Sequence, residues 1–105
     1  MAGTYETVAD ELQADPAVKP GSMFGHRCLK TGRKVFACEY EGELLVKLPP
    51  DRLEELKRDG ARDFMPMGRK MNGWILVVEP ADDAVAVWLD VAEEAKAFVA
   101  AAEAA

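Results

Sequence analysis

Apolar residues recur along the chain with two different spacings, and the change between them divides the sequence into predicted elements. The first spacing, of three and four residues, is typical of one face of a helix and is formed by Tyr5, Val8, Ala9 and Leu12. This helix should end at Asp15-Pro16, because the residue before a proline disfavours helical backbone. The stretch Pro16–Ser22 holds two prolines and a glycine, which predicts a connector.

From Met23 onward the pattern changes to short segments rich in aromatic and branched residues, which predicts strands. These segments are Met23–Lys30, Lys34–Tyr40 and Glu43–Leu48. The pairs Thr31-Gly32 and Glu41-Gly42 separate them, and each supplies the glycine that a tight turn needs. The pattern therefore predicts an antiparallel meander of three strands.

The second half of the chain predicts a helix, two strands and a final helix. The first of these helices follows Pro50 and ends at Gly60, and the strands are expected at Ala61–Pro66 and Met71–Glu79. The run 74–78 is continuously apolar, as in a strand that is central or covered on both faces. After Pro80, an apolar stripe at helical spacing, which we interpret as core, comprises Trp88, Val91, Ala92, Ala95, Phe98 or Val99, and Ala102.

The resulting element order is α-β-β-β-α-β-β-α. Helices combined with antiparallel strands in this order predict an α+β fold, a two-layer sandwich with the helices packed on an antiparallel sheet. The length of 105 residues is typical of one domain, so we expect residues 1–105 to form a single domain.

Charge and hydropathy narrow the class of protein. The net charge is −6, but residues 19–70 hold twelve basic and eight acidic residues, so the middle of the chain is mildly basic. The overall acidity argues against a protein devoted to nucleic-acid backbones. No apolar run approaches the roughly 20 residues that span a bilayer, and the acidic N-terminus does not resemble a signal peptide. We therefore expect a cytoplasmic protein with no membrane contact.

The two cysteines, Cys28 and Cys38, are expected to be free thiols in that compartment. A tight turn at Thr31-Gly32 would place them out of register and on opposite faces of the sheet. A disulfide between them is then not expected, unless a bulge reverses the parity.

The sequence contains few candidate catalytic residues. His26 and Cys28 share a face of one predicted strand and could form a thiol–imidazole pair, but the sequence supplies no orienting acid and no oxyanion site. One histidine and two cysteines fall short of the four ligands of structural zinc. Phosphate-binding glycine loops are absent from the sequence. We predict a non-enzymatic protein without a cofactor or metal, in which thiol chemistry at Cys28 or Cys38 is the remaining catalytic alternative.

Basic side chains at predicted loop tips are the candidate binding residues. The pairs Arg33-Lys34 and Arg69-Lys70 lie at two turns and would hold an anion if the fold brings them together; otherwise they are solvated surface. With Lys47 they make the predicted binding set of Arg33, Lys34, Lys47, Arg69 and Lys70. The methionines Met23, Met65, Met67 and Met71 suit either gap-filling in a core or an adaptable binding surface.

An ordered set of short motifs resembles one known family. The set comprises Met23-Phe24-Gly25, Thr31-Gly32-Arg33-Lys34, Val35-Phe36-Ala37, Glu41-Gly42-Glu43-Leu44, Lys47, Phe64-Met65-Pro66-Met67-Gly68 and Trp88. Over residues 5 to 100 the chain is similar to the TfoX N-terminal domain family. The resemblance implies helices packed on an antiparallel sheet, and it supplies no established catalytic residues.

That family takes its name from a bacterial regulator of DNA-uptake competence, in which this domain precedes a second domain. The resemblance therefore implies a non-catalytic interaction or regulatory domain, with a protein partner or self-association expected. The alternative is a domain that binds a small molecule, a nucleotide or a nucleic acid through the sheet face and the basic loop tips. Nucleic acid is the less favoured ligand because of the net charge.

Overall fold

The computed structural model describes residues 3–23 and 25–104 of the chain. Phe24, part of the Met23-Phe24-Gly25 motif and of the first predicted strand, lies outside the described residues. In order, the elements are α1 (Thr4–Leu12), β1 (Val18–Met23), β2 (His26–Thr31), β3 (Lys34–Tyr40), β4 (Glu43–Lys47), α2 (Pro50–Arg58), β5 (Arg62–Asp63), the 3-10 turn η1 (Pro66–Gly68), β6 (Trp74–Val77) and α3 (Ala84–Ala104).

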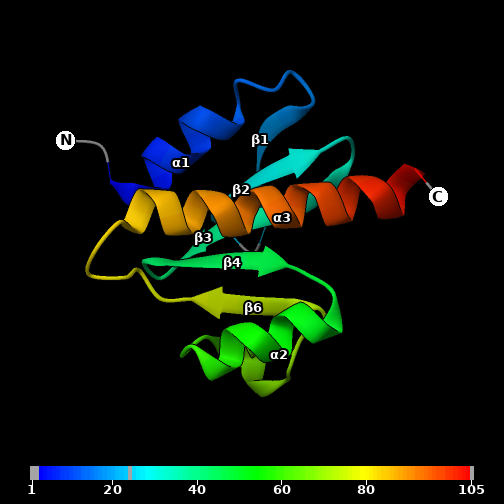
Figure 1. Ribbon diagram of the computed structural model, residues 1–105. Helices are drawn as coiled ribbons and strands as arrows, with labels where there is room; N and C mark the ends of the chain where they lie inside the picture. The colour runs from blue at the N-terminus through cyan, green and yellow to red at the C-terminus, as the bar shows by residue number, and fades with distance from the viewer. Residues whose placement is uncertain (1–2, 24, 105) are drawn as a thin grey trace.

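The six strands form one antiparallel sheet in the order β1-β2-β3-β4-β6-β5. Helices α1 and α3 pack against each other, and α3 runs across β3 and β4 (Figure 1). The α+β class, the helices on an antiparallel sheet and the predicted element order are confirmed, with one strand added.

The added strand is β1, at Val18–Met23, where the prolines and glycine predicted a connector. It pairs with β2 along its whole length, and Pro20 lies opposite Leu29. Proline is tolerated here because β1 is the edge strand, where one side of the backbone needs no sheet partner. The prediction of a connector at Pro16–Ser22 was wrong because an edge strand tolerates proline and glycine, which a central strand would not.

The strand boundaries shift accordingly. Met23 ends β1, and Gly25 takes a φ of 78° in the turn before β2. The fourth predicted strand is reduced to the two residues of β5, whereas β6 lies between β4 and β5 and is buried at all four positions. The prediction of a strand covered on both faces is confirmed for β6.

The main core lies between the helices and the sheet. Alternate strand residues such as Phe36, Val46 and Ile75 are fully buried there. The stripe predicted on the last helix covers them, since Trp88, Val91, Ala92, Ala95 and Val99 all belong to this core. None of the helices in the described part of the chain is long and apolar enough to cross a membrane.

A second, smaller cluster lies on the opposite face of the sheet. It contains Cys28, Cys38, Leu45, Phe64, Trp74 and Leu76. Phe64 enters this cluster from the segment between β5 and β6, which therefore covers a face that carries no helix. Both faces of the central strands are thus buried.

The cysteines form a disulfide in the structure, which overturns the expectation of free thiols. The β2–β3 register shifts between Leu29 and Lys30, because a bulge inserts one extra residue on β3. The shift makes Cys28 and Cys38 direct cross-strand partners on the same face, with their Cα atoms 4.0 Å apart. The prediction that the two cysteines lie on opposite faces was wrong because the hydrophobic pattern does not reveal a bulge.

Candidate functional site

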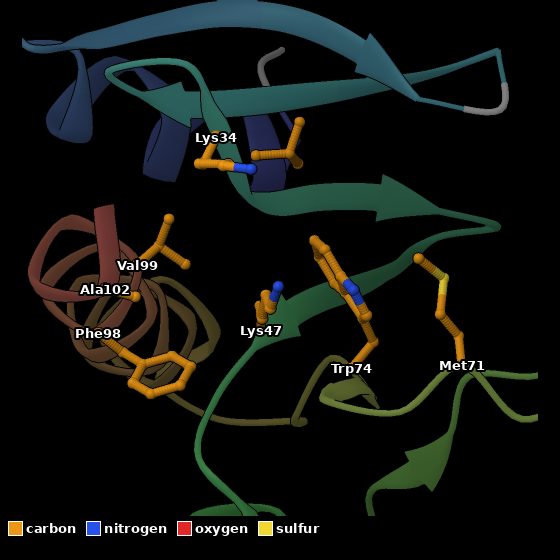
Figure 2. Close-up of a pocket in the computed structure, with 8 residues that line it drawn as sticks. Lys34, Lys47, Met71, Trp74, Phe98, Val99 and Ala102 are labelled. Carbon is orange, nitrogen blue, oxygen red and sulfur yellow. The ribbon is translucent and has the colours of Figure 1, made fainter. Parts of the chain in front are cut away.

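A pocket of about 560 Å³ opens at one end of the sheet, where β3 begins, β4 ends and β6 begins. It is lined by Lys34, Val35, Lys47, Met71, Trp74, Phe98, Val99 and Ala102. Figure 2 shows the last two turns of α3 on one side of the space and Trp74 on the other, with Lys47 between them. The volume falls within the range of small-molecule sites.

The walls of the pocket come from both hydrophobic clusters. Val99 belongs to the main core and Phe98 packs against it, whereas Trp74 belongs to the second cluster and Met71 packs against that one. The pocket therefore lies where the strands end and the two buried faces of the sheet approach each other. Its apolar lining follows directly from the two-sided burial of β6.

The backbone that positions Trp74 turns sharply just before β6. Gly73 has a φ of 89°, in the left-handed region that favours glycine, and its carbonyl accepts a hydrogen bond from the backbone N–H of Leu48 at 3.0 Å. The N–H of Met71 donates to the carbonyl of Phe64 at 2.9 Å. These bonds fix both ends of the segment that brings Met71 and Trp74 to the pocket.

Two lysines supply the charged groups of the described lining side chains. Lys47 and Trp74 are paired across β4 and β6, and the Lys47 Nζ lies 6.0 Å from the centre of the Trp74 ring. Lys34 is the first residue of β3. Figure 2 shows the amino group of Lys47 directed toward β3. Both side chains are exposed at the opening of an otherwise apolar space.

Neither lysine has an acidic partner within the described residues. Most other basic side chains do: Arg27 pairs with Glu6 and Glu39, and Arg52 pairs with Glu94. Further ion pairs involve Lys57, Arg62, Lys70 and Lys96. The two pocket lysines therefore keep their positive charge available for a ligand.

The two ammonium groups give the opening of the pocket a positive charge. Phe98 and Ala102 of α3 add apolar surface beside them. The opening therefore attracts anions.

The structure brings together two of the five predicted binding residues. Lys34 and Lys47 line the pocket, while Arg33 lies in the turn before β3. Arg69 and Lys70 are exposed in the segment after η1, and Lys70 lies 3.7 Å from Asp63. The pair Arg69-Lys70 does not line the pocket, although it directly precedes Met71.

Sequence reasoning missed the apolar half of the site. Trp74 was predicted to lie in a buried strand and Phe98 in a core stripe. Trp74 belongs to the second cluster and Phe98 packs against the main core, so most of each side chain is buried as predicted. A local signal existed at Gly73, because a glycine inside a predicted strand indicates an irregular backbone at that position. Nothing in the sequence indicated that α3 reaches the same end of the sheet.

The histidine and cysteines occupy another part of the sheet. The ring of His26 lies against that of Tyr40, with centroids 4.5 Å apart. Cys28 and Cys38 are each only 1% exposed and are joined to one another, so in this state neither sulfur is a nucleophile. Across the described residues, no cluster of three or more His, Cys, Asp or Glu side chains could hold a metal ion.

Comparison with known protein families identifies a match over most of the chain. The model of the TfoX N-terminal domain family matches residues 10–101, which is nearly the whole chain. No curated protein sequence matches the chain significantly.

Proposed function

The chain belongs to the TfoX N-terminal domain family, and from this premise we propose that it is a non-catalytic regulatory domain that binds a small anionic molecule in the pocket. The observation that carries the proposal is the pair Lys34 and Lys47, two cations at the opening of an apolar pocket that make no ion pair with the acidic side chains that the structure describes. Such a site recognises a ligand that joins an anionic group to an apolar body. Binding of this kind needs no catalytic group.

The energetic argument rests on where the charges lie. An ammonium group that bonds a ligand anion contributes about 1.5–3 kcal/mol when water is partly excluded. The apolar walls exclude water from one side of the opening, because Val99 and Trp74 are almost fully buried. A lysine on open surface gains far less from the same contact, which is why the pocket is a better anion site than the loop tips.

A thermal-shift screen with small anionic compounds tests this proposal. A ligand that binds the native state raises the melting temperature, and the double variant Lys34→Met/Lys47→Met should lose that shift. Lys19→Met is the matched control, because Lys19 is an exposed lysine on β1 that does not line the pocket. An anion that stabilises the double variant and the wild type equally would place its binding elsewhere and contradict the proposal.

A second candidate function is contact with a protein partner through two exposed methionines. Met67 is 98% exposed and Met65 is 55% exposed, on either side of Pro66. Met67 also has a φ of 58°, a left-handed conformation that is unfavourable for a side-chain-bearing residue. Met67 thus exposes an apolar side chain from a backbone conformation that costs energy. This combination favours a role in contact with a partner.

The contact role is tested by comparing wild type with Met65→Ser/Met67→Ser in light scattering and in pull-downs from source-cell lysate, with and without nuclease. Self-association or specific capture that the double variant loses, and that survives nuclease, would support a protein contact at these residues. Retention that disappears with nuclease would instead indicate nucleic acid. Retention unchanged by the double variant would exclude the methionine surface.

A further inference from the structure

We propose that the ligand of the pocket is an aromatic monocarboxylic acid. This inference rests on the proposed function and specifies its ligand. It is drawn from three properties of the lining: which donors are present, what charge surrounds them, and which apolar groups face the space. Each property excludes a class of ligand.

The donors favour a carboxylate over a phosphate. The described lining side chains offer as donors the ammonium groups of Lys34 and Lys47 and the indole N–H of Trp74, and none of them is an arginine or carries a hydroxyl or amide. A phosphate monoester presents three strongly accepting oxygens, which proteins usually satisfy with arginine forks, backbone N–H groups or a helix N-terminus. Two point-like cations match the two oxygens of a single carboxylate.

The surrounding charge favours an anion over a neutral ligand. The ammonium groups of Lys34 and Lys47 make the opening of the pocket electropositive. A neutral aromatic molecule gains nothing from these charges, whereas a carboxylate is attracted by both.

The apolar lining favours a flat aromatic body. Trp74 and Phe98 come from opposite sides of the opening, and Met71 adds a polarisable thioether (Figure 2). Aromatic rings pack on such side chains in offset or edge-to-face geometries, and methionine sulfur also contacts ring edges favourably. Apart from the lysines and the indole N–H of Trp74, no described lining side chain carries a polar group, so a sugar or a polyhydroxylated ligand would leave most of its hydroxyl groups without partners.

The test uses 2-naphthoate as the probe and the two tryptophan indole N–H signals in ¹⁵N-labelled protein as the readout. Trp74 lines the pocket, whereas Trp88 is 1% exposed and its indole N–H donates to the carbonyl of Val78 at 3.4 Å. Binding in the pocket should therefore shift the Trp74 signal and leave the Trp88 signal nearly unchanged. Three comparison ligands accompany the probe: 2-naphthyl phosphate, 2-naphthalenemethanol and octanoate.

The expected result is that 2-naphthoate binds about tenfold more tightly than each comparison ligand. Lys34→Met and Lys47→Met should each weaken 2-naphthoate binding by about tenfold or more, the lower limit expected for one charged contact. Lys19→Met should leave it unchanged, and the dispersion of the spectra reports whether each variant is folded. This pattern would establish both the anionic group and the aromatic body.

Different failures overturn different parts of the argument. Tighter binding of the phosphate, or equal binding of octanoate, would overturn the aromatic monocarboxylate while leaving the anion-binding function intact. Equal binding of the neutral alcohol would show that the lysines do not select the ligand, which would overturn the inference and the proposed anion site. A Trp74 signal that no anionic compound shifts, in this set or among the hits of the thermal-shift screen, would overturn both.

Discussion

Cys28 and Cys38 are direct partners across the β2–β3 hairpin, and a disulfide joins them on the face of the sheet that carries no helix. The bond closes a loop of ten residues along the chain. It belongs to the same hydrophobic cluster as Trp74, and it joins the two strands of the hairpin that carries Lys34. The oxidation state of this pair therefore bears on the stability of the fold.

Reduction of the disulfide should lower the free energy of unfolding by about 2–3 kcal/mol, the chain-entropy value for a loop of this length. Urea unfolding of the wild type with and without dithiothreitol measures the change. The variant Cys28→Ala/Cys38→Ala is the control, because its stability should not respond to the reductant. Two free thiols in the purified, unreduced protein, counted by mass spectrometry after alkylation, would contradict the disulfide.

The fold was largely predictable because its periodicities are local. The helical stripe from Trp88 to Val99 and the apolar run at Trp74–Val77 each determine an element and its buried face. Two features were not predictable because they depend on distant partners. The edge strand around Pro20 exists only because β2 offers it a neighbour, and the register of Cys28 depends on a bulge that leaves no mark in the hydrophobic pattern.

The site was predictable only in its charged half. Lys34, at a predicted turn, and Lys47, in a predicted strand, both belong to the predicted binding set, but nothing in the sequence distinguished them from Arg69. The two lysines differ from Arg69 in their surroundings. Apolar side chains line the pocket beside the lysines, whereas Arg69 lies on the exposed surface. Those walls are assembled from α3 and β6, which meet at this end of the sheet only in the folded chain.

The contact between Arg52 on α2 and Glu94 on α3 should contribute about 0.5–1 kcal/mol of coupling. The Arg52 Nε lies 2.8 Å from one carboxylate oxygen and its Nη2 lies 3.0 Å from the other, a bidentate geometry on a partly exposed surface. A double-mutant cycle with Arg52→Met and Glu94→Gln isolates the coupling, since Arg52 also lies 4.0 Å from Glu55. The coupling should shrink in 1 M salt, and a salt-independent value would show that packing carries it instead.

Alkaline pH should destabilise the protein through Tyr5. Burial raises the pKa of Tyr5 from 10.0 to about 12, although the nearby positive charge of Arg27 acts in the opposite direction. Between these values the native state keeps the phenol proton and the unfolded state has lost it, so the free energy of unfolding falls as pH rises. The stability present below pH 10 should thus decrease by about 1.4 kcal/mol for each pH unit, to a total of about 2–3 kcal/mol near pH 12.

The variant Tyr5→Phe measures the Tyr5 contribution, because other groups titrate in the same range. Urea unfolding of both proteins between pH 8 and pH 12 should show the wild type losing stability relative to Tyr5→Phe above pH 10. The aromatic ring is kept, so its packing in the core and its contact with Arg27, whose guanidinium carbon lies 5.1 Å from the ring centre, are preserved. Parallel curves for the two proteins would mean that the phenol ionises equally in the native and unfolded states.

Met67→Gly should stabilise the protein by about 0.5–1 kcal/mol. The residue lies at a φ of 58°, where glycine avoids the steric cost of a Cβ atom, and its side chain is 98% exposed, so its removal costs no packing. Met65→Gly is the matched control: Met65 has a φ of −127°, so glycine there relieves no strain and only adds flexibility to the unfolded chain. Thermal and urea unfolding should therefore move in opposite directions for the two variants. If Met67→Gly is more stable but no longer captures a partner, the strained conformation is retained for contact with that partner. If Met67→Gly is less stable, the Met67 side chain packs against the protein in the native state.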